Sequence, residues 1–390
     1  MRILIANDRF DVHGGVQSYL ESVVPGLRSR AHDIAMLSTD VASAGPQSQM
    51  PDVPHFTVAG GGTDQALAAA RHWRPDICFS HNVADADVDR RLLDLVPVVK
   101  FVHAYEATCV SGRKMFDVPV ARPCDRRFGL ACTALYFPRR CGGLSVPTMV
   151  QRYRLTRARH ALLTRYPAIT VLSAHMKREC VKHGVDDRKV HVMPYFSSVP
   201  VVPELEAQLD LSVIFAGRMT SLKGGGLLIR AVADASRRLE APIQLTMLGD
   251  GSDRAGWERL AAGLNLSCTF PGWQHGDARL PWFERASLLA VPSVWPEPYG
   301  LVGPEAAAAG VPAIAFDVGG IREWLTPGEN GYLVPADPPT ARAFADGLVA
   351  AFRRPDELRA MRRRTYAAAR RFALPRHLDV LEETLSSCSR

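Results

Sequence analysis

The sequence predicts two successive α/β domains, each built on a parallel β-sheet with helices on both faces. Short and almost continuous apolar segments alternate with helical segments along the chain, as is typical of parallel strands that are buried on both faces. A segment without period, containing two prolines, interrupts this alternation at 197–203 and is interpreted as a linker. The length of 390 residues suits two domains, and 47% hydrophobic with 22% charged residues is typical of a globular protein.

The first domain is expected over residues 1–200. Strands are predicted at 2–6, 33–38, 75–80, 96–103, 168–172 and 189–193, and helices at 16–27 and 173–182. The chain enters its first strand without the apolar core and cleavage site of a secretory signal, so we expect a cytoplasmic protein. No apolar run approaches the roughly 20 residues of a membrane-spanning helix. Eight cysteines are too few for a disulfide scaffold.

The second domain is expected over residues 205–372. Strands are predicted at 211–216, 244–248, 287–291 and 311–316, and helices at 224–239, 303–309 and 340–352. A final helix, at about 375–385 within the segment 375–390, would be able to pack back on the first domain.

The stretch 296–312 carries the most specific chemical signal. It follows a predicted strand and opens a helix, where free N–H groups suit a phosphate. Gly300 and Gly303 allow the backbone to approach a ligand closely. Glu297 and Glu305 are placed to accept hydrogen bonds from sugar hydroxyls, as acidic residues do on nucleotide ribose. A turn with charge-favoured glutamates would explain Glu305 alone, but it does not explain the whole stretch.

Two loops after predicted strands add to this signal. Arg218 and Lys223 follow the strand 211–216 and precede three glycines, and two cations at the carboxyl end of a parallel strand suit a diphosphate. The loop does not match the phosphate-loop pattern G-x-x-x-x-G-K-[ST]. Near the start of the chain, the run 13–17 contains a glycine pair ending at Gly15, which would let the first domain touch a phosphate or sugar. A tight strand–helix turn is the alternative interpretation of this pair.

Taken together, these features resemble the large retaining glycosyltransferase family with the GT-B architecture, family 4 (glycosyl transferases group 1). The resemblance covers nearly the whole chain and is strongest over 211–335, where the E-x7-E pattern from Glu297 to Glu305 is its specific part. It implies two facing Rossmann-like domains with a cleft between them. It also implies transfer of a hexose-type sugar from a nucleoside-diphosphate sugar, with retention of the anomeric configuration.

The resemblance implies a role for individual residues. Arg218 and Lys223 would hold the donor diphosphate, Glu305 the ribose and Glu297 the transferred sugar. Backbone groups near the phosphates are expected at Gly300, Leu301, Val302 and Gly303. Trp273 and Gln274, in the loop 271–275, would lie near the nucleobase, and the segments 319–323 and 330–335 also look like family elements.

His103 ends an apolar strand, as the family's active-site histidine does, and the resemblance places it near the transferred sugar. The family often has an acidic residue next, where this chain has Ala104. A histidine at a strand end is otherwise usually structural.

The chemistry implied by the resemblance uses charge rather than a hydrolase acid/base pair. Arg218, Lys223 and the helix start would stabilise the departing diphosphate, and that phosphate would help to take the acceptor proton during front-face attack. No divalent metal or other cofactor is expected, and a UDP-sugar is slightly favoured over a GDP-sugar by its frequency in the family. Two D-x-D matches within 85–89 are interpreted as a helix start with acidic residues near its positive end.

The segment 113–165 is strongly basic. It holds twelve Lys and Arg against Asp117 and Asp125, in a chain of net charge +7. Such a patch suits anionic lipid, an acidic acceptor or nucleic acid, or it is simply a solvated face rich in arginine. Acceptor loops are expected at 105–146, so we expect a glycan, lipid-linked or small-molecule acceptor and no nucleic acid, and the segment would allow peripheral contact with an anionic inner membrane face.

Four cysteines within or beside this segment lack any C-x2-C pair: Cys109, Cys124, Cys132 and Cys141. A zinc site, a thiol-bearing acceptor loop and small buried residues remain alternative interpretations.

Two other classes of function compete with the transferase. A non-catalytic sugar- or nucleotide-binding paralogue is suggested by Ala104, but the complete set of Arg218, Lys223, Glu297 and Glu305 weighs against it. A nucleotide-dependent oxidoreductase would need the G-x-G-x-x-G fingerprint and its acidic partner, and the sequence contains neither.

Overall fold

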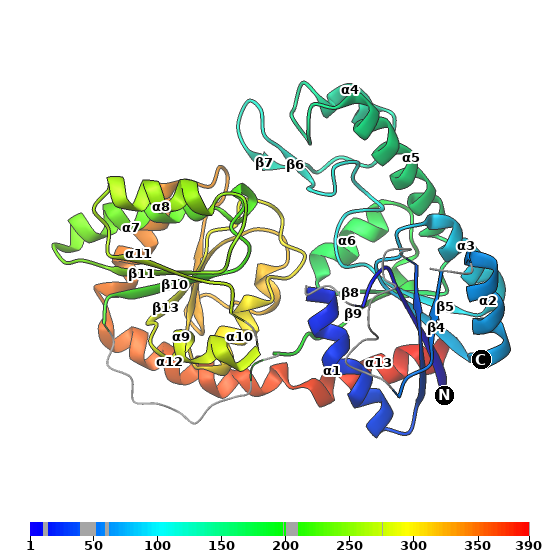
Figure 1. Ribbon diagram of the computed structural model, residues 1–390. Helices are drawn as coiled ribbons and strands as arrows, with labels where there is room; N and C mark the ends of the chain where they lie inside the picture. Colours follow the sequence, from blue (N-terminus) through cyan, green and yellow to red (C-terminus); the bar gives the residue numbers. More distant parts are fainter. Residues whose placement is uncertain are drawn as a thin grey trace. The chain divides into compact units, whose positions relative to one another are not determined.

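The computed structural model describes residues 1–10, 15–39, 52–58, 62–197, 199, 210–274 and 276–389. These residues form two compact units. Unit 1 combines Met1–Lys114, Asp125–Tyr195 and Leu374–Arg390, and unit 2 combines Met115–Cys124 and Phe196–Ala373. Each unit contains its own parallel sheet (Figure 1), so the predicted α/β class is confirmed. The predicted linker lies outside the described residues except for Ser197 and Val199.

The sheet of unit 1 is parallel throughout its described pairs. Its strands, in spatial order, are β3 (His55–Thr57), β2 (Asp33–Ser38), β1 (Arg2–Asn7), β4 (Ile77–Ser80), β5 (Val98–Phe101), β8 (Ala168–Val171) and β9 (Val190–Val192). In the register, Ile3 lies between Ile34 of β2 and Ile77 of β4. β4 and β8 are buried along their whole length, which explains why these strands read as continuous apolar runs.

The helices of unit 1 are α1 (Gly15–Ser29), α2 (Gly62–Trp73), α3 (Ala86–Leu95), α4 (Ala131–Tyr136), α5 (Val146–Leu162), α6 (Ala174–Lys182) and α13 (Leu374–Cys388). α13 packs against α1 and also contacts β4 and β5, so the last helix of the chain is part of this unit. Local capping fixes helix starts: the Ser173 hydroxyl accepts from the Met176 N–H ahead of α6.

The sheet of unit 2 is also parallel. Its strands, in spatial order, are β12 (Cys268–Gly272), β11 (Gln244–Leu248), β10 (Ser212–Ala216), β13 (Leu288–Val291), β14 (Ala313–Phe316) and β15 (Gly331–Val334). Counted from β10, this order is 3-2-1-4-5-6, the order of dinucleotide-binding α/β sheets. A small antiparallel ladder joins β6 (Met115–Phe116) to β7 (Arg122–Pro123).

The helices of unit 2 lie on both sides of its sheet (Figure 1). They are α7 (Gly225–Leu239), α8 (Arg254–Gly263), α9 (Leu280–Glu284), α10 (Val302–Ala308), α11 (Ala341–Phe352) and α12 (Pro355–Ala369). α7 packs against α11, and α10 packs against α12. In the part of the chain that the structure describes, no helix is both long and apolar enough to cross a membrane.

In both sheets, successive strands are first added on one side of the first strand and then on its other side. This switch point lies between β1 and β4 in unit 1 and between β10 and β13 in unit 2. Loops leave the carboxyl ends of these paired strands in opposite directions and open a crevice, where α/β proteins of this kind bind their ligands.

Candidate active site

The predicted cations of unit 2 follow the carboxyl end of β10, at the switch point. Arg218 is exposed, and it makes no salt bridge with the residues that the structure describes. Lys223 ends the short 3-10 helix Ser221–Lys223, and its side chain is partly buried. The loop after β13 meets this segment, because the Val294 N–H donates to the Leu222 carbonyl at 2.9 Å.

Glu297 is a buried carboxylate, and two side chains donate hydrogen bonds to the same one of its oxygens. The Lys223 ammonium donates to its Oε1 at 2.6 Å, and the Ser293 hydroxyl donates to the same oxygen at 2.5 Å. Glu297 is only 3% exposed. No hydrogen bond from the described residues reaches its second oxygen, Oε2, which leaves that oxygen available to accept from a ligand.

Close backbone contact brings these two loops together. Gly224 has a left-handed φ of 69°, and a Cβ atom there would lie 1.9 Å from the Pro292 carbonyl oxygen. Only glycine fits this position, which brings the start of α7 against the end of β13. The backbone of Glu297 is held as well, because the Gly320 N–H donates to its carbonyl at 2.7 Å.

The predicted residues around the start of α10 have partners within unit 2. Glu305 accepts a hydrogen bond at 2.6 Å from Arg279, the last residue of the 3-10 helix Gly276–Arg279. Gly303 is buried, and a Cβ there would lie 2.3 Å from the indole of Trp324. The absence of a side chain at Gly303 is therefore required by packing. Gly300, Leu301 and Val302 are half-buried.

The predicted nucleobase loop begins where β12 ends. Trp273 is 46% exposed, which is unusual for so large an apolar side chain. The Gln274 amide donates to the Pro271 carbonyl at 3.4 Å. His275 lies outside the described residues.

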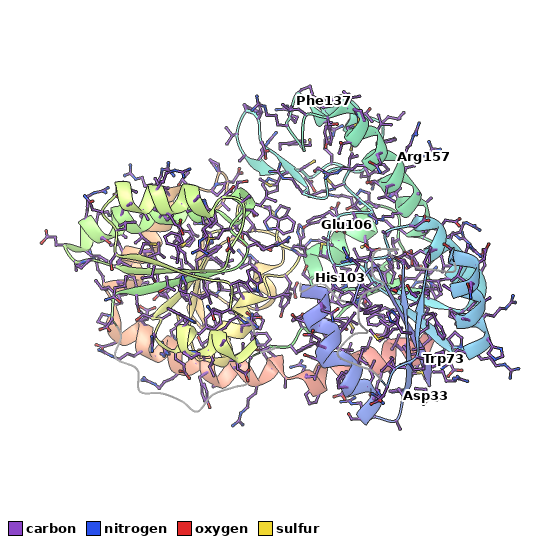
Figure 2. All side chains as sticks on the ribbon, viewed as in Figure 1. Asp33, Trp73, His103, Glu106, Phe137 and Arg157 are labelled. Carbon is purple, nitrogen blue, oxygen red and sulfur yellow. The ribbon has the colours of Figure 1, made fainter. Side chains whose placement is uncertain are left out.

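In unit 1, the predicted His103 lies just beyond β5 (Figure 2) and joins a second histidine. Its Nε2 lies 2.9 Å from Nδ1 of His81, which follows β4 directly. The two rings are stacked, with centroids 5.2 Å apart. Gly15 is the first residue of α1 and is exposed, whereas His13 and Gly14 lie outside the described residues.

The histidine pair belongs to a buried aromatic cluster. Tyr19 of α1 packs edge-on against Phe101 and lies 2.8 Å, hydroxyl to Nε2, from His377 of α13. His377 Nδ1 lies 2.7 Å from the Pro194 carbonyl. Since a carbonyl only accepts, His377 is protonated on Nδ1, and the Tyr19 hydroxyl donates to Nε2.

The histidines of this cluster are held neutral. Burial, reinforced by the charge of Lys100, lowers the pKa of His103 to about 3. Burial likewise lowers the pKa of His377 to about 4 and takes the pKa of His81 well below its usual range. At neutral pH these rings act as uncharged hydrogen-bonding groups.

A buried ion pair between Lys100 and Asp89 contacts this cluster through the backbone of His81. Lys100 of β5 donates to Asp89 Oδ2 at 2.5 Å and to the His81 carbonyl at 2.7 Å. The Ser80 and Tyr166 hydroxyls also donate to the Asp89 carboxylate, at 2.6 and 3.1 Å. Asp85 caps α3 as predicted, by accepting from the Asp87 N–H. Asp87 and Asp89 lie in the first turn of α3, as the sequence predicted, and Asp89 in addition forms the buried ion pair with Lys100.

The basic segment is exposed over α4, α5 and the loops around them, a part of unit 1 that is visible beside α3 and α6 in Figure 1. Its exposed arginines in unit 1 are Arg126, Arg127, Arg140, Arg152, Arg154, Arg157 and Arg165. Lys114 is an exception, because it is 3% exposed and forms an ion pair with Glu179. Leu130 and Leu144 lie among the arginines and are 79% and 73% exposed.

Two of the segment's cysteines have a packing explanation. Cys132 and Cys141 pack against a small core of Val110, Tyr136 and Met149, as small apolar residues do. Across the described residues, no group of three or more His, Cys, Asp or Glu side chains is arranged to hold a metal ion. Cys109 and Cys124 are half-buried, and the Cys109 sulfur accepts from the Lys114 N–H at 3.3 Å.

Sequence reasoning missed several residues of these sites. Ser293 and Arg279 are partners of the predicted glutamates, but a serine after a strand and an arginine in a helical segment carry no distinctive pattern. His81 directly follows the predicted strand 75–80, and His103 ends the predicted strand 96–103, so this similar position was the signal that could have found His81.

Comparisons with known proteins show what the chain is similar to. Residues 210–354 match the family described as glycosyl transferases group 1. The chain is 28% identical over 375 residues to the phosphatidyl-myo-inositol mannosyltransferase of Mycobacterium tuberculosis, covering 90% of this chain and 87% of that protein. It is 34% identical over 183 residues to the D-inositol 3-phosphate glycosyltransferase of Nocardia farcinica, covering 45% and 40% of the two chains.

A solved structure extends the similarity to the whole fold. The crystal structure of Anabaena HepE in complex with UDP and glucose matches with a TM-score of 0.71 at 18% identity, covering 99% of this chain and all of that one. At this identity the match concerns the fold.

Proposed function

Because this chain is a glycosyltransferase with the GT-B fold, we propose that it transfers a hexose-type sugar, with retention, from a nucleoside-diphosphate sugar to an acceptor. The observation that carries the proposal is the arrangement around Glu297. A buried carboxylate is held through one oxygen by Lys223 and Ser293, and the loop after β10 that supplies Lys223 also carries an exposed arginine, Arg218. Such a set suits a sugar joined to a diphosphate.

The proposed roles follow from the charges of unit 2. Arg218 binds the diphosphate and stabilises the charge that develops on it as the sugar leaves. Lys223 fixes Glu297 and has further N–H donors for a phosphate oxygen. Glu297 Oε2 accepts from a sugar hydroxyl, and Glu305 accepts from the ribose. Gly15, Gly300, Leu301, Val302 and Gly303 are proposed to lie against the phosphates.

For the nucleotide, we propose UDP before GDP. The solved HepE complexes contain UDP, glucose or UDP-glucose. Trp273 supports a flat ligand in the same region of unit 2, because an exposed indole offers a face on which a base can stack. Gln274 would accompany it.

For the acceptor, we propose a polyol that carries a phosphate or a lipid. Two similar proteins are named for phosphatidyl-myo-inositol and D-inositol 3-phosphate. The arginines of the α4–α5 region supply the charge that such a phosphate requires.

The first experiment measures donor hydrolysis and binding. The purified protein is incubated with UDP-, GDP-, ADP- and TDP-sugars, and the released nucleoside diphosphate is detected by mass spectrometry, with thermal shift measured in parallel. One nucleotide should be released and should stabilise the protein, and once an acceptor is added, NMR of the glycosylated product should show a retained anomeric configuration.

Matched variants make this experiment specific. Arg218→Ala should weaken nucleotide binding by roughly tenfold, the value of one charge-assisted hydrogen bond. Arg237→Ala removes another exposed arginine, on α7, whose ion pair among the described residues is with Asp234 of the same helix, and should change nothing. Failure of every nucleotide to bind would overturn the proposed donor site and favour a non-catalytic paralogue.

We also propose that the α4–α5 region lies on anionic membrane. Leu130 and Leu144 are exposed among arginines, which combines apolar insertion with attraction to anionic lipid. The protein should sediment with phosphatidylcholine vesicles that contain phosphatidylglycerol, and less so at high salt. Leu130→Ser with Leu144→Ser should release it, whereas Leu264→Ser, at an exposed leucine of unit 2, should not. Equal binding to vesicles without phosphatidylglycerol would contradict the proposal.

A further inference from the structure

The contact between His81 and His103 restricts which ring nitrogen of each histidine carries the proton. Both rings are neutral at physiological pH. A neutral imidazole carries one N–H donor and one acceptor nitrogen. The 2.9 Å contact between His81 Nδ1 and His103 Nε2 therefore exists only if one of these nitrogens is protonated and the other is not. The tautomer of one ring sets that of the other.

The surroundings of His81 decide the direction of this bond. The residue is 1% exposed, and its Nε2 is buried without a hydrogen-bond partner among the described residues. The rings of Phe79 and Phe101 lie against it, with centroids 4.4 and 5.5 Å away. A buried N–H without an acceptor is rarer in proteins than a buried acceptor without a donor. This favours a proton on Nδ1 of His81 and a bare lone pair on Nε2.

We infer that His81 is a positioning residue that donates from Nδ1 to His103 Nε2 and thereby holds His103 as its Nδ1–H tautomer. His103 then offers an N–H donor on Nδ1 and no free lone pair. This rests on the proposed function, in which His103 contacts the transferred sugar. In that role His103 donates a hydrogen bond to a sugar oxygen and does not remove a proton.

Two further contacts hold His81 in place for this task. Its carbonyl accepts from the Lys100 ammonium, whose charge is balanced by the buried Asp89. Tyr19, fixed by its bond to His377, packs against both rings at 5.5 and 6.4 Å between centroids. The ring of His81 is therefore held between the ends of two neighbouring strands and a helix.

The tautomers are measured directly in the wild-type protein by two-bond proton–nitrogen NMR on 15N-histidine-labelled samples. The signals are assigned by their loss in His81→Asn and His103→Asn. Both rings should show a protonated Nδ1 and an unprotonated Nε2. A protonated Nε2 on His103 would overturn the inference, and this reading needs no transferase activity.

Variants at His81 separate positioning from simple packing. Asn places an amide N–H close to where Nδ1 stands, whereas Phe fills the space without a donor. With His81→Phe, His103 should change to the Nε2–H form that free histidine favours, and kcat should fall roughly tenfold with little change in the donor KM. His81→Asn should keep the wild-type tautomer of His103 and most of kcat.

Variants at His103 test the role of its donor. Asn imitates Nδ1 and Gln imitates Nε2, so His103→Asn should retain roughly tenfold more kcat/KM than His103→Gln. The opposite order would overturn the inference. If no variant and no wild-type sample transfers sugar, the proposed function fails, while the NMR result still decides the tautomer.

Discussion

Glu297 and Lys223 form a charged pair that is partly removed from water. The glutamate side chain is 4% exposed and that of the lysine 25%. Breaking such a pair by removing one charge leaves the other poorly compensated, whereas removing both is much less costly. The pair is thus a structural element as well as the proposed sugar contact, and variants must separate the two effects.

The first prediction concerns this pair. Glu297→Gln should lower the free energy of unfolding by about 1–3 kcal/mol, because Lys223 loses its charged partner. Lys223→Met in addition should restore part of that loss, which urea denaturation of the four proteins of the cycle measures. Transfer activity should stay at least about a hundredfold lower in both variants that lack Glu297, since charge stabilisation at the reacting sugar is lost. Recovery of activity in the double variant would contradict the proposed contact.

At the scale of elements, the strands that lie inside each sheet, with a neighbour on both sides, were predictable. β2 and β11 begin and end where the sequence places them, because their apolar runs are bounded by polar or turn residues. The edge strands β3, β12 and β15 were missed as strands. β12, for example, contains Pro271 and has no fully buried residue, so it lacks the pattern of a buried strand.

The candidate sites show the same limit. Glu297, Lys223 and His103 were predictable because each stands at the end of a predicted strand or in a specific spacing. Ser293 lies only four residues before Glu297, but no sequence pattern marks it as a partner, whereas His81 comes from another segment and only the fold brings it within hydrogen-bonding distance of His103. Pairing across strands depends on sheet order, which a single sequence does not determine.

The second prediction concerns the start of α7. Gly224→Ala should destabilise the protein by more than about 2 kcal/mol, since its left-handed φ and the Pro292 carbonyl leave no room for a side chain. Gly226→Ala is the matched control, because the nearest atom to its added Cβ is 3.6 Å away. It should be neutral or stabilise by up to about 1 kcal/mol, as alanine favours helix. Equal destabilisation by the two changes, measured by urea denaturation, would show that Gly224 has no special role.

At the scale of the whole molecule, the buried histidines of unit 1 link its stability to pH. The pKa of His377 is lowered to about 4 and that of His103 to about 3, both by burial. An unfolded histidine takes up its proton near pH 6.5. Between these values the unfolded chain binds more protons than the folded one, so stability falls as the pH drops below about 6.5.

The third prediction concerns this loss of stability at acidic pH. Between pH 6 and 4.5 each of these histidines should contribute about 1.4 kcal/mol per pH unit to the loss of stability. His377→Gln, which keeps an acceptor for Tyr19, should make the dependence shallower by about that slope. Urea denaturation followed by circular dichroism at a series of pH values measures it. An unchanged slope would mean that His377 is protonated in the folded protein.

The membership of α13 in unit 1 has a consequence for synthesis on the ribosome. Residues Met1–Lys114 and Asp125–Tyr195 of unit 1 emerge first, but Leu374–Cys388 follows only after the 178 residues of Phe196–Ala373 have been made. At about 5–20 residues per second this delay lasts roughly ten to thirty-five seconds. During that time His377 and the buried Leu378, Leu381 and Leu385 are missing, so the nascent chain exposes the apolar face of α1 and the ends of β4 and β5 to chaperones. The first unit to be translated is therefore the last to be completed.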